Sequence, residues 1–191
     1  KTKSINFLKK INLRQNDFYL IVGRLIPDNN SNLIIEGFLK SSSSKKIVIV
    51  GDVTYRDYYA SQVKKMASKN VIFTGYINCQ EKLTQLYQNC FCYLHGHEFG
   101  GTNPTMVNAL HLNAEIIALK TKFNIEMLEN KKSIFFEKTI DSVANAINLF
   151  EKKHFEQRKL NSNYILNDKY NWDLITEKYL DLFNKIYQFP K

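Results

Sequence analysis

Six short apolar segments alternate with stretches of helical periodicity along this chain, and that alternation limits the folds open to it. The segments are continuously apolar and rich in β-branched residues, which is typical of strands buried on both faces of a sheet. They comprise residues 18–23, 46–51, 71–74, 91–94, 115–119 and 133–136. Helical patterns follow near residues 33–39, 57–68, 81–89, 105–112, 124–129, 141–153 and 173–187. Strands separated by helices predict right-handed crossovers and an α/β fold with a parallel sheet and helices on both faces.

Six such units suit a Rossmann-like sheet of about six strands in the order 3-2-1-4-5-6. In that order the first and fourth strands are neighbours, and a ligand crevice opens between their carboxyl ends. Arg24 comes directly after the first strand, and a polar segment, residues 95–104, follows the fourth. We therefore expect these two loops to meet, although about seventy residues separate them.

The segment after the fourth strand has the features of an anion or nucleotide site. Gly100 and Gly101 lack Cβ, so the backbone there can turn sharply and approach a ligand. Asn103 and Pro104 suit the start of a helix near Thr105. The free N–H groups and the dipole of such a helix favour a bound phosphate.

Composition is that of one globular domain. The chain has 191 residues, of which 44% are apolar and 24% charged, and its net charge is +9. The lysines are scattered, so we interpret the charge as mostly solvated surface, with attraction to an acidic membrane surface as the alternative. No apolar run approaches the ~20 residues that a membrane span needs. No helix-turn-helix, RNP-like aromatic run or basic stripe supports nucleic-acid binding.

Cysteine usage and the first residue bear on location and completeness. Cys90 and Cys92 lie two apart in a predicted strand, so their side chains should face opposite ways and cannot bridge. An odd total of three cysteines favours a reducing cytoplasm. The chain starts at Lys1, without Met or a signal-peptide core, so we expect an internal fragment. We expect residues 1–16 to be a lead-in or interdomain segment and residues 17–191 to be the domain.

Three segments, in register and on the expected elements, resemble one known family. They are Ile-Val-Gly-Arg-Leu-Ile-Pro-Asp-Asn-Asn (21–30), Val-Ile-Phe-Thr-Gly-Tyr (71–76) and His-Gly-His-Glu-Phe-Gly-Gly-Thr-Asn-Pro-Thr-Met-Val-Asn-Ala-Leu (95–110). They resemble the carboxyl-terminal domain of GT-B fold glycosyltransferases of the retaining family 4. The Gly-Gly-Thr-Asn-Pro and Pro-Asp-Asn-Asn runs look most like its rhamnosyltransferase-like subgroup. The likeness covers roughly residues 17–187.

The resemblance implies a donor-binding domain whose amino-terminal partner domain, absent here, would supply the glycan acceptor contacts. The full enzyme would move a sugar, with rhamnose as one candidate, from a nucleotide sugar to a cell-surface glycan. It would need no metal or other cofactor, and it would work in the cytoplasm, with peripheral attachment to the inner face of the membrane as an option. The fragment alone should bind the donor without turnover.

The resemblance also assigns residues. Arg24 becomes the catalytic clamp on the diphosphate, because a guanidinium pairs with phosphate oxygens in a bidentate manner. The helix near Thr105 would stabilise charge that develops on the leaving diphosphate. The implied donor-binding residues are Gly23, Arg24, Asn29, His97, Glu98, Gly100, Gly101, Thr102, Asn103, Pro104, Thr105 and Asn108.

One position departs from the family pattern. A glutamate that accepts hydrogen bonds from ribose hydroxyls in the family aligns with Asn108, which carries no charge. Its partner position falls at Gly100, with Glu98 two residues earlier. Weak nucleotide affinity, an atypical donor and an inactive protein are the three alternatives that this leaves.

The two histidines of the polar segment allow a second interpretation. His95 and His97 bracket a glycine, so they could point the same way, like metal ligands. No third ligand at a suitable spacing is evident, which favours hydrogen bonds to the donor or to loop backbone.

Two rival functions come from other classes. A degenerate glycosyltransferase-like module for protein association is favoured by Asn108. A Rossmann dehydrogenase is disfavoured because the first strand is followed by Gly-Arg-Leu-Ile-Pro in place of Gly-x-Gly-x-x-Gly. Trp172, Tyr179 and Phe183 of the last helix suggest core or an interdomain face.

Overall fold

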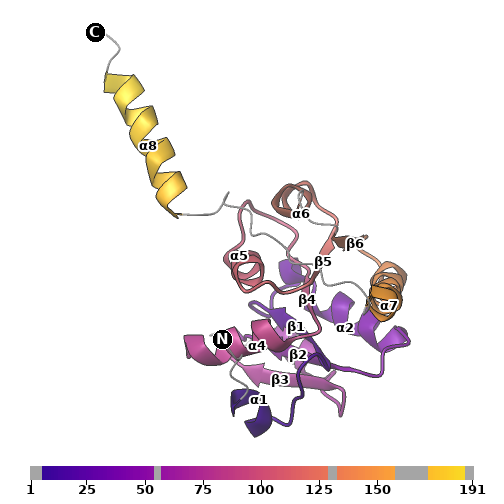
Figure 1. The fold of residues 1–191 in the computed structure, drawn as a ribbon. Coiled ribbons are helices and arrows are strands. Elements are labelled where there is room, and N and C mark those ends of the chain that lie inside the picture. Colours follow the sequence, from indigo (N-terminus) through magenta and orange to yellow (C-terminus); the bar gives the residue numbers. More distant parts are fainter. Residues whose placement is uncertain (1–5, 54–56, 129–132, 158–171, 188–191) are drawn as a thin grey trace.

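The computed structural model describes residues 6–53, 57–128, 133–157 and 172–187, and it contains a single six-stranded parallel sheet (Figure 1). The strand order is β3-β2-β1-β4-β5-β6, which confirms the predicted order. The strands are β1 (Phe18–Val22), β2 (Lys46–Val50), β3 (Val71–Gly75), β4 (Cys92–His95), β5 (Ile116–Leu119) and β6 (Ile134–Phe136). All five pairings between neighbouring strands are parallel.

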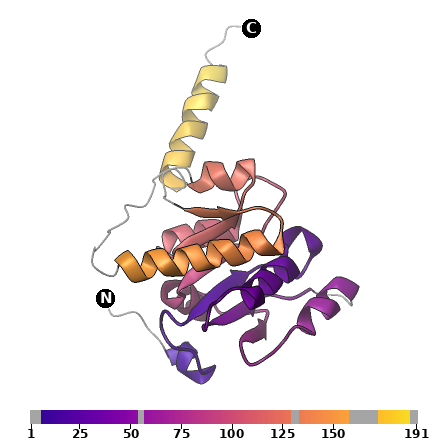
Figure 2. The same cartoon turned by 90° about the vertical axis from the view of Figure 1, so that its right-hand side faces the viewer.

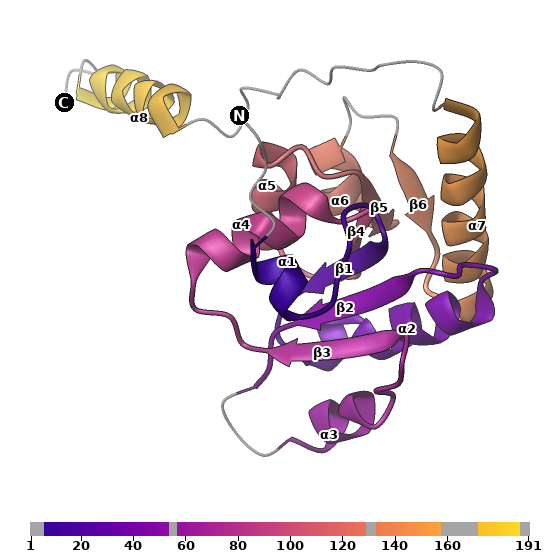
Figure 3. The same cartoon turned by 60° about the horizontal axis from the view of Figure 1, so that its bottom comes forward.

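Helices cover both faces of the sheet (Figures 2 and 3). One face packs against α2 (Ser31–Lys40), α3 (Tyr58–Lys64) and α7 (Ile140–Gln157). The other packs against α1 (Asn6–Lys10), α4 (Gln80–Asn89), α5 (Pro104–His111) and α6 (Lys122–Leu128). Alternate residues of each strand enter the two hydrophobic clusters. Continuous apolar strands were therefore a sound signal, because a strand between two helical layers has no solvent face.

The side chains of β1 alternate between the two hydrophobic clusters. Tyr19 and Ile21 belong to the cluster under α2 and α7, whereas Phe18 and Leu20 belong to the cluster under α4 and α5. Cys90 and Cys92 do lie in different clusters, but strand alternation is not the reason, because residues two apart in a strand face the same way. Cys92 lies in the first cluster and Cys90, which caps α4 instead of lying in the strand, lies in the second.

Two short elements lie near the amino terminus. Residues 1–16, expected to be an irregular lead-in with an amphipathic turn at residues 5–11, contain α1, and Leu8 and Leu13 are buried in the core beside α4. The backbone N–H of Phe7 donates to Oε1 of Gln85 at 2.8 Å, which ties this helix to the domain. The predicted exit loop of β1 holds a 3₁₀ turn, Pro27–Asn29.

The last helix has no buried residue. In α8 (Trp172–Tyr187) the side chains of Trp172, Tyr179 and Phe183 are exposed, so of the two expectations core is wrong and an interdomain face stays a prediction. The reason is that an amphipathic pattern predicts an apolar face without saying what covers it. None of the described helices is both long and apolar enough to cross a membrane.

Candidate functional site

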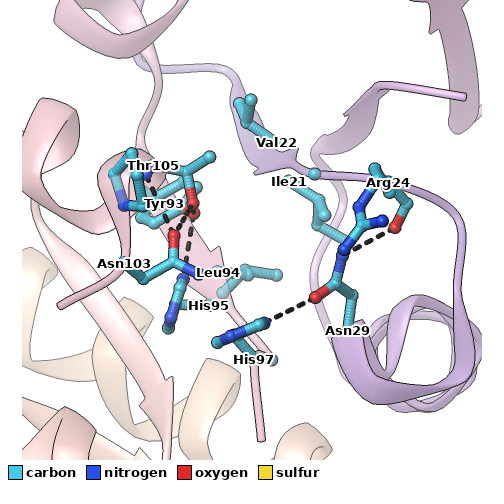
Figure 4. Close-up of a pocket in the computed structure, with 13 residues that line it drawn as sticks. Ile21, Val22, Arg24, Asn29, Tyr93, Leu94, His95, His97, Asn103 and Thr105 are labelled. Atoms are coloured by element: carbon cyan, nitrogen blue, oxygen red, sulfur yellow. Dashed lines mark hydrogen bonds between the residues drawn. The ribbon is translucent and has the colours of Figure 1, made fainter. Parts of the chain in front are cut away.

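A cavity of about 180 Å³ opens at the carboxyl ends of β1 and β4, where the strand order predicted a crevice. Figure 4 shows its two walls, one from the loop after β1 and one from the loop after β4 and the start of α5. The lining residues are Ile21, Val22, Gly23, Arg24, Asn29, Tyr93, Leu94, His95, Gly96, His97, Asn103, Pro104 and Thr105.

Arg24 forms the positive wall. Its side chain is exposed, and no hydrogen bond or ion pair in the described ranges engages the guanidinium. A free guanidinium on a cavity wall can donate two parallel hydrogen bonds to phosphate oxygens.

Asn29 and His97 join the two walls. Nδ2 of Asn29 donates to the Arg24 carbonyl at 2.7 Å, so the Oδ1 atom is the acceptor that lies 2.7 Å from Nδ1 of His97. It follows that Nδ1 of His97 carries a proton and donates across the crevice. These two hydrogen bonds link the backbone carbonyl of Arg24 through Asn29 to His97, and they hold the Arg24 backbone where the two walls meet.

Gly96 allows the loop after β4 to lie against the loop after β1. A Cβ at that position would lie 2.5 Å from the backbone oxygen of Asn29 and 2.7 Å from Cδ1 of Ile34. Nδ2 of Asn30, a buried residue in the left-handed conformation, donates to the Gly96 carbonyl at 2.9 Å. Only glycine lets the two loops approach so near.

The start of α5 matches the sequence prediction. Oδ1 of Asn103 accepts from the backbone N–H of Thr105 at 3.0 Å, and Pro104 occupies the first helical position. Pro104 has no N–H and the Thr105 N–H is already bonded, so this end of α5 can act on an anion through the positive end of the helix dipole. Pro104 and Thr105 place this end against the cavity.

Two buried residues of β4 complete the floor: His95, for which hydrogen bonds to the donor or to loop backbone were expected, and Tyr93, which was not expected there. Tyr93 and His95 are one and three percent exposed. Burial, with a smaller effect of His97, lowers the pKa of His95 to about 3, so its ring is neutral at physiological pH. Oη of Tyr93 lies 3.0 Å from Nδ1 of His95 and 2.8 Å from Oγ1 of Thr105. The two-residue spacing of Tyr93 and His95 in a strand was the available signal.

The remaining predicted donor residues lie outside the cavity lining, which does not include Glu98, Gly100, Gly101, Thr102 or Asn108. Gly100, Gly101 and Thr102 are exposed, and Asn108 is half-buried on α5.

Glu98 connects loops instead of facing the cavity. Its Oε2 accepts from Nζ of Lys138 at 2.6 Å, and its backbone N–H donates to the Asp28 carbonyl at 3.0 Å. The hydrogen bond from Lys138 lowers the pKa of Glu98, with a smaller contribution from Asn30. The contact between Glu98 and Lys138 therefore links the loop after β4 to the loop after β6.

A larger cavity of about 490 Å³ lies elsewhere, between α1, β3 and α4. Its lining is largely apolar, and its one cation, Lys82, lies 5.4 Å over the ring of Phe7. The smaller cavity therefore has the chemistry of an anion site. Among the described residues, no group of three or more His, Cys, Asp or Glu side chains could hold a metal ion.

Solved structures share this fold. HepE of Anabaena, crystallised with UDP and glucose, superposes with a TM-score of 0.78 at 15% identity, over 93% of this chain and 50% of that one. A glycosyltransferase of Rickettsia africae gives 0.76 at 13% identity, over 96% and 51%. The carboxyl-terminal domain of a group 1 glycosyl transferase, LpcC of Francisella tularensis, gives 0.67 at 18% identity, over 94% of both chains.

The chain thus spans about half the length of HepE and of the Rickettsia protein, and 94% of the isolated carboxyl-terminal domain of LpcC. No curated protein sequence matches it. The family described as glycosyl transferases group 1 matches residues 4–167, which include both walls of the cavity. On that match the chain belongs to the glycosyl transferases group 1 family.

Proposed function

We propose that this domain binds the diphosphate and sugar of a nucleotide sugar, as the donor-binding half of a glycosyltransferase. The observation that carries the proposal is the exposed Arg24 guanidinium on a cavity that also receives the start of α5. A guanidinium and a helix start on one cavity both favour a phosphate. HepE, which has the same fold, was crystallised with UDP-glucose, which makes UDP the first nucleotide to try.

Catalysis would rest on positioning and electrostatics. When the bond between sugar and phosphate breaks, negative charge grows on the leaving diphosphate. Arg24 and the positive end of the α5 dipole would stabilise that charge more in the transition state than in the ground state. Asn29 and His97 would keep Arg24 in place, because their hydrogen bond and the one to the Arg24 carbonyl span the crevice. The mechanism assigns no role to a metal ion.

Calorimetric titration with UDP, GDP and dTDP tests the donor site. We expect saturable binding of one nucleotide and a loss of about tenfold or more in Arg24→Ala, because a charge-assisted hydrogen bond is worth ~1.5–3 kcal/mol. Arg14→Ala is the matched control, since it removes the same charge from an exposed residue at the other end of β1. Equal affinity in all three proteins would contradict the proposal.

The finer assignments rest on the Gly-Gly-Thr-Asn-Pro and Pro-Asp-Asn-Asn runs. They support rhamnose as the transferred sugar and a cell-surface glycan as the acceptor, with the acceptor held by a further domain. We place the enzyme in the cytoplasm, with peripheral contact to the membrane through its basic surface. Transfer assays of the longer protein with rhamnose and glucose donors would distinguish the sugars.

The alternative is a non-catalytic module, which Asn108 favours because it supplies no carboxylate. Replacing it by glutamate separates the two cases. If the site is an active donor site of unusual type, Asn108→Glu will change nucleotide affinity. If the domain is a non-catalytic module without a donor site, neither the natural chain nor the variant will bind any of the three nucleotides.

A further inference from the structure

Nε2 of His95 is the one buried side-chain polar atom in the described part of the chain that has no hydrogen-bond partner. Buried polar atoms nearly always have a hydrogen-bond partner, so an unpaired one in a residue that lines a cavity indicates a partner that binds there. His95 lines the cavity between β1 and β4, and its other nitrogen is already engaged by Tyr93.

The protons in this network can be assigned by counting. Three contacts run in series, from His95 to Tyr93 at 3.0 Å, from Tyr93 to Thr105 at 2.8 Å, and from Thr105 to Oδ1 of Asn103 at 2.7 Å. Each contact needs one hydrogen. Oδ1 of Asn103 has none and already accepts the Thr105 backbone N–H, so the Thr105 hydroxyl donates to it.

The rest of the series follows from that end. Because the Thr105 hydrogen is used, the Tyr93 hydroxyl must donate to Oγ1 of Thr105. Oη of Tyr93 then has no hydrogen left for His95, so Nδ1 of His95 is the donor. Figure 4 shows the three side chains in this order, from the start of α5 to the β4 wall.

The other nitrogen of His95 is therefore fixed as an acceptor. A neutral imidazole carries one proton, and here it is on Nδ1. The low pKa that burial gives the ring means that no second proton is added at physiological pH. Nε2 carries a bare lone pair, and because it is closed off from solvent in the ligand-free chain, a ligand reaches it only when neighbouring atoms move aside.

A bare lone pair selects its partner. Phosphate oxygens in a diphosphate have only lone pairs at neutral pH, so they cannot bond to it. A hydroxyl group can. The cavity holds about 180 Å³, roughly six waters at ~30 Å³ each, which suits a part of a nucleotide sugar better than the whole.

We propose that Nε2 of His95 accepts a hydrogen bond from a hydroxyl of the donor's sugar ring, and that Tyr93 and Thr105 act as positioning residues that hold the required tautomer. The proposal rests on the proposed function. It divides the cavity into a phosphate side at Arg24 and a sugar side at His95.

The tautomer is tested first, by nitrogen NMR of the chain labelled with ¹⁵N-histidine and free of ligand. We expect Nδ1 of His95 to be protonated and Nε2 to be unprotonated at neutral pH. Tyr93→Phe removes the acceptor and should give a mixture of tautomers, whereas Tyr19→Phe, which removes a buried hydroxyl bonded to Glu151 and outside this network, should not. A proton on Nε2 in the natural chain would overturn the proposal.

The ligand is tested by calorimetry with UDP alone and with UDP-glucose, UDP-galactose and UDP-N-acetylglucosamine. We expect the tightest sugar nucleotide to bind more tightly than UDP, and His95→Phe to remove about fivefold of that gain while leaving UDP affinity within about twofold. Phenylalanine keeps the volume of the ring without its nitrogens. His95→Gln, which offers an acceptor oxygen, should restore part of the gain.

A second variant guards against misfolding of the first. Tyr93→Phe keeps His95 and should lose part of the same gain with UDP affinity unchanged. The proposal is overturned if folded His95→Phe keeps the whole gain, as a buried water at Nε2 would predict, or if UDP and the sugar nucleotides weaken equally. Failure of the natural chain to bind UDP or any sugar nucleotide would overturn the proposed function and this proposal together, and is recognised because no variant is then involved.

Discussion

His95 makes the stability of the fold depend on pH. Its folded pKa of about 3 lies below the ordinary value of about 6.5, so between these values the unfolded chain binds more protons than the folded chain. Its contribution is complete above pH ~6.5 and is lost as the pH falls toward 3. We predict a loss of about 1.4 kcal/mol per pH unit from this residue.

Urea unfolding at neutral pH and at about pH 5 measures the effect. In His95→Phe the pH dependence should be shallower by that amount, because phenylalanine does not titrate. The other histidines are common to both proteins and cancel in the difference. Identical pH dependences would mean that the His95 pKa is not depressed.

Gly96 is the second residue with a sharp expectation. Gly96→Ala should destabilise the fold by about 1–3 kcal/mol, since its Cβ would overlap the backbone of Asn29. Gly101→Ala is the matched control, because a Cβ there meets nothing within 4 Å and should change stability by less than ~0.5 kcal/mol. Thermal unfolding of both variants checks this, and similar midpoints would refute the close contact.

At the scale of single residues, some positions in the site could be predicted from the sequence and others could not. Sequence reasoning placed Gly23, Arg24, Asn29, His97 and the Asn103–Thr105 turn around one crevice, because they follow adjacent parallel strands. It could not foresee that Glu98 pairs with Lys138, forty residues away, since that contact depends on how two loops fold.

At the scale of elements, the cap of α5 shapes the cavity. Asn103→Ala should cost about 1 kcal/mol, because the Thr105 N–H loses its acceptor, while Asn103→Asp should keep most of the stability. Chemical unfolding of the two variants compares them. If alanine is as stable as aspartate, the cap does not hold the helix start.

The major elements could be predicted because each apolar strand and each helix carries its own periodicity. Two short elements could be predicted only in part or not at all. The sequence indicated an amphipathic turn at residues 5–11, but not that burial of Leu8 would hold the five-residue helix α1 in the core. The 3₁₀ turn Pro27–Asn29 depends on Asn30 adopting φ +52°, which is a property of the packed loop.

At the scale of the whole molecule, the chain is one half of proteins such as HepE in length, and α8 exposes aromatic side chains. We predict that these 191 residues bind a nucleotide but do not transfer sugar, because the proposed function assigns the acceptor contacts to a further domain. Release of UDP from UDP-glucose in the presence of glycan acceptors is the assay. Robust transfer by this chain alone would contradict the prediction.

The most direct test of the donor site is a map of backbone amide shifts on addition of the nucleotide. We predict that the largest amide shift changes fall on Gly23, Arg24, His97 and Thr105, near the carboxyl ends of β1 and β4, and that the Arg14 amide does not shift. Changes confined to the apolar cavity around Phe7 and Tyr76, or saturating binding that leaves Arg24 and Thr105 unmoved, would contradict it.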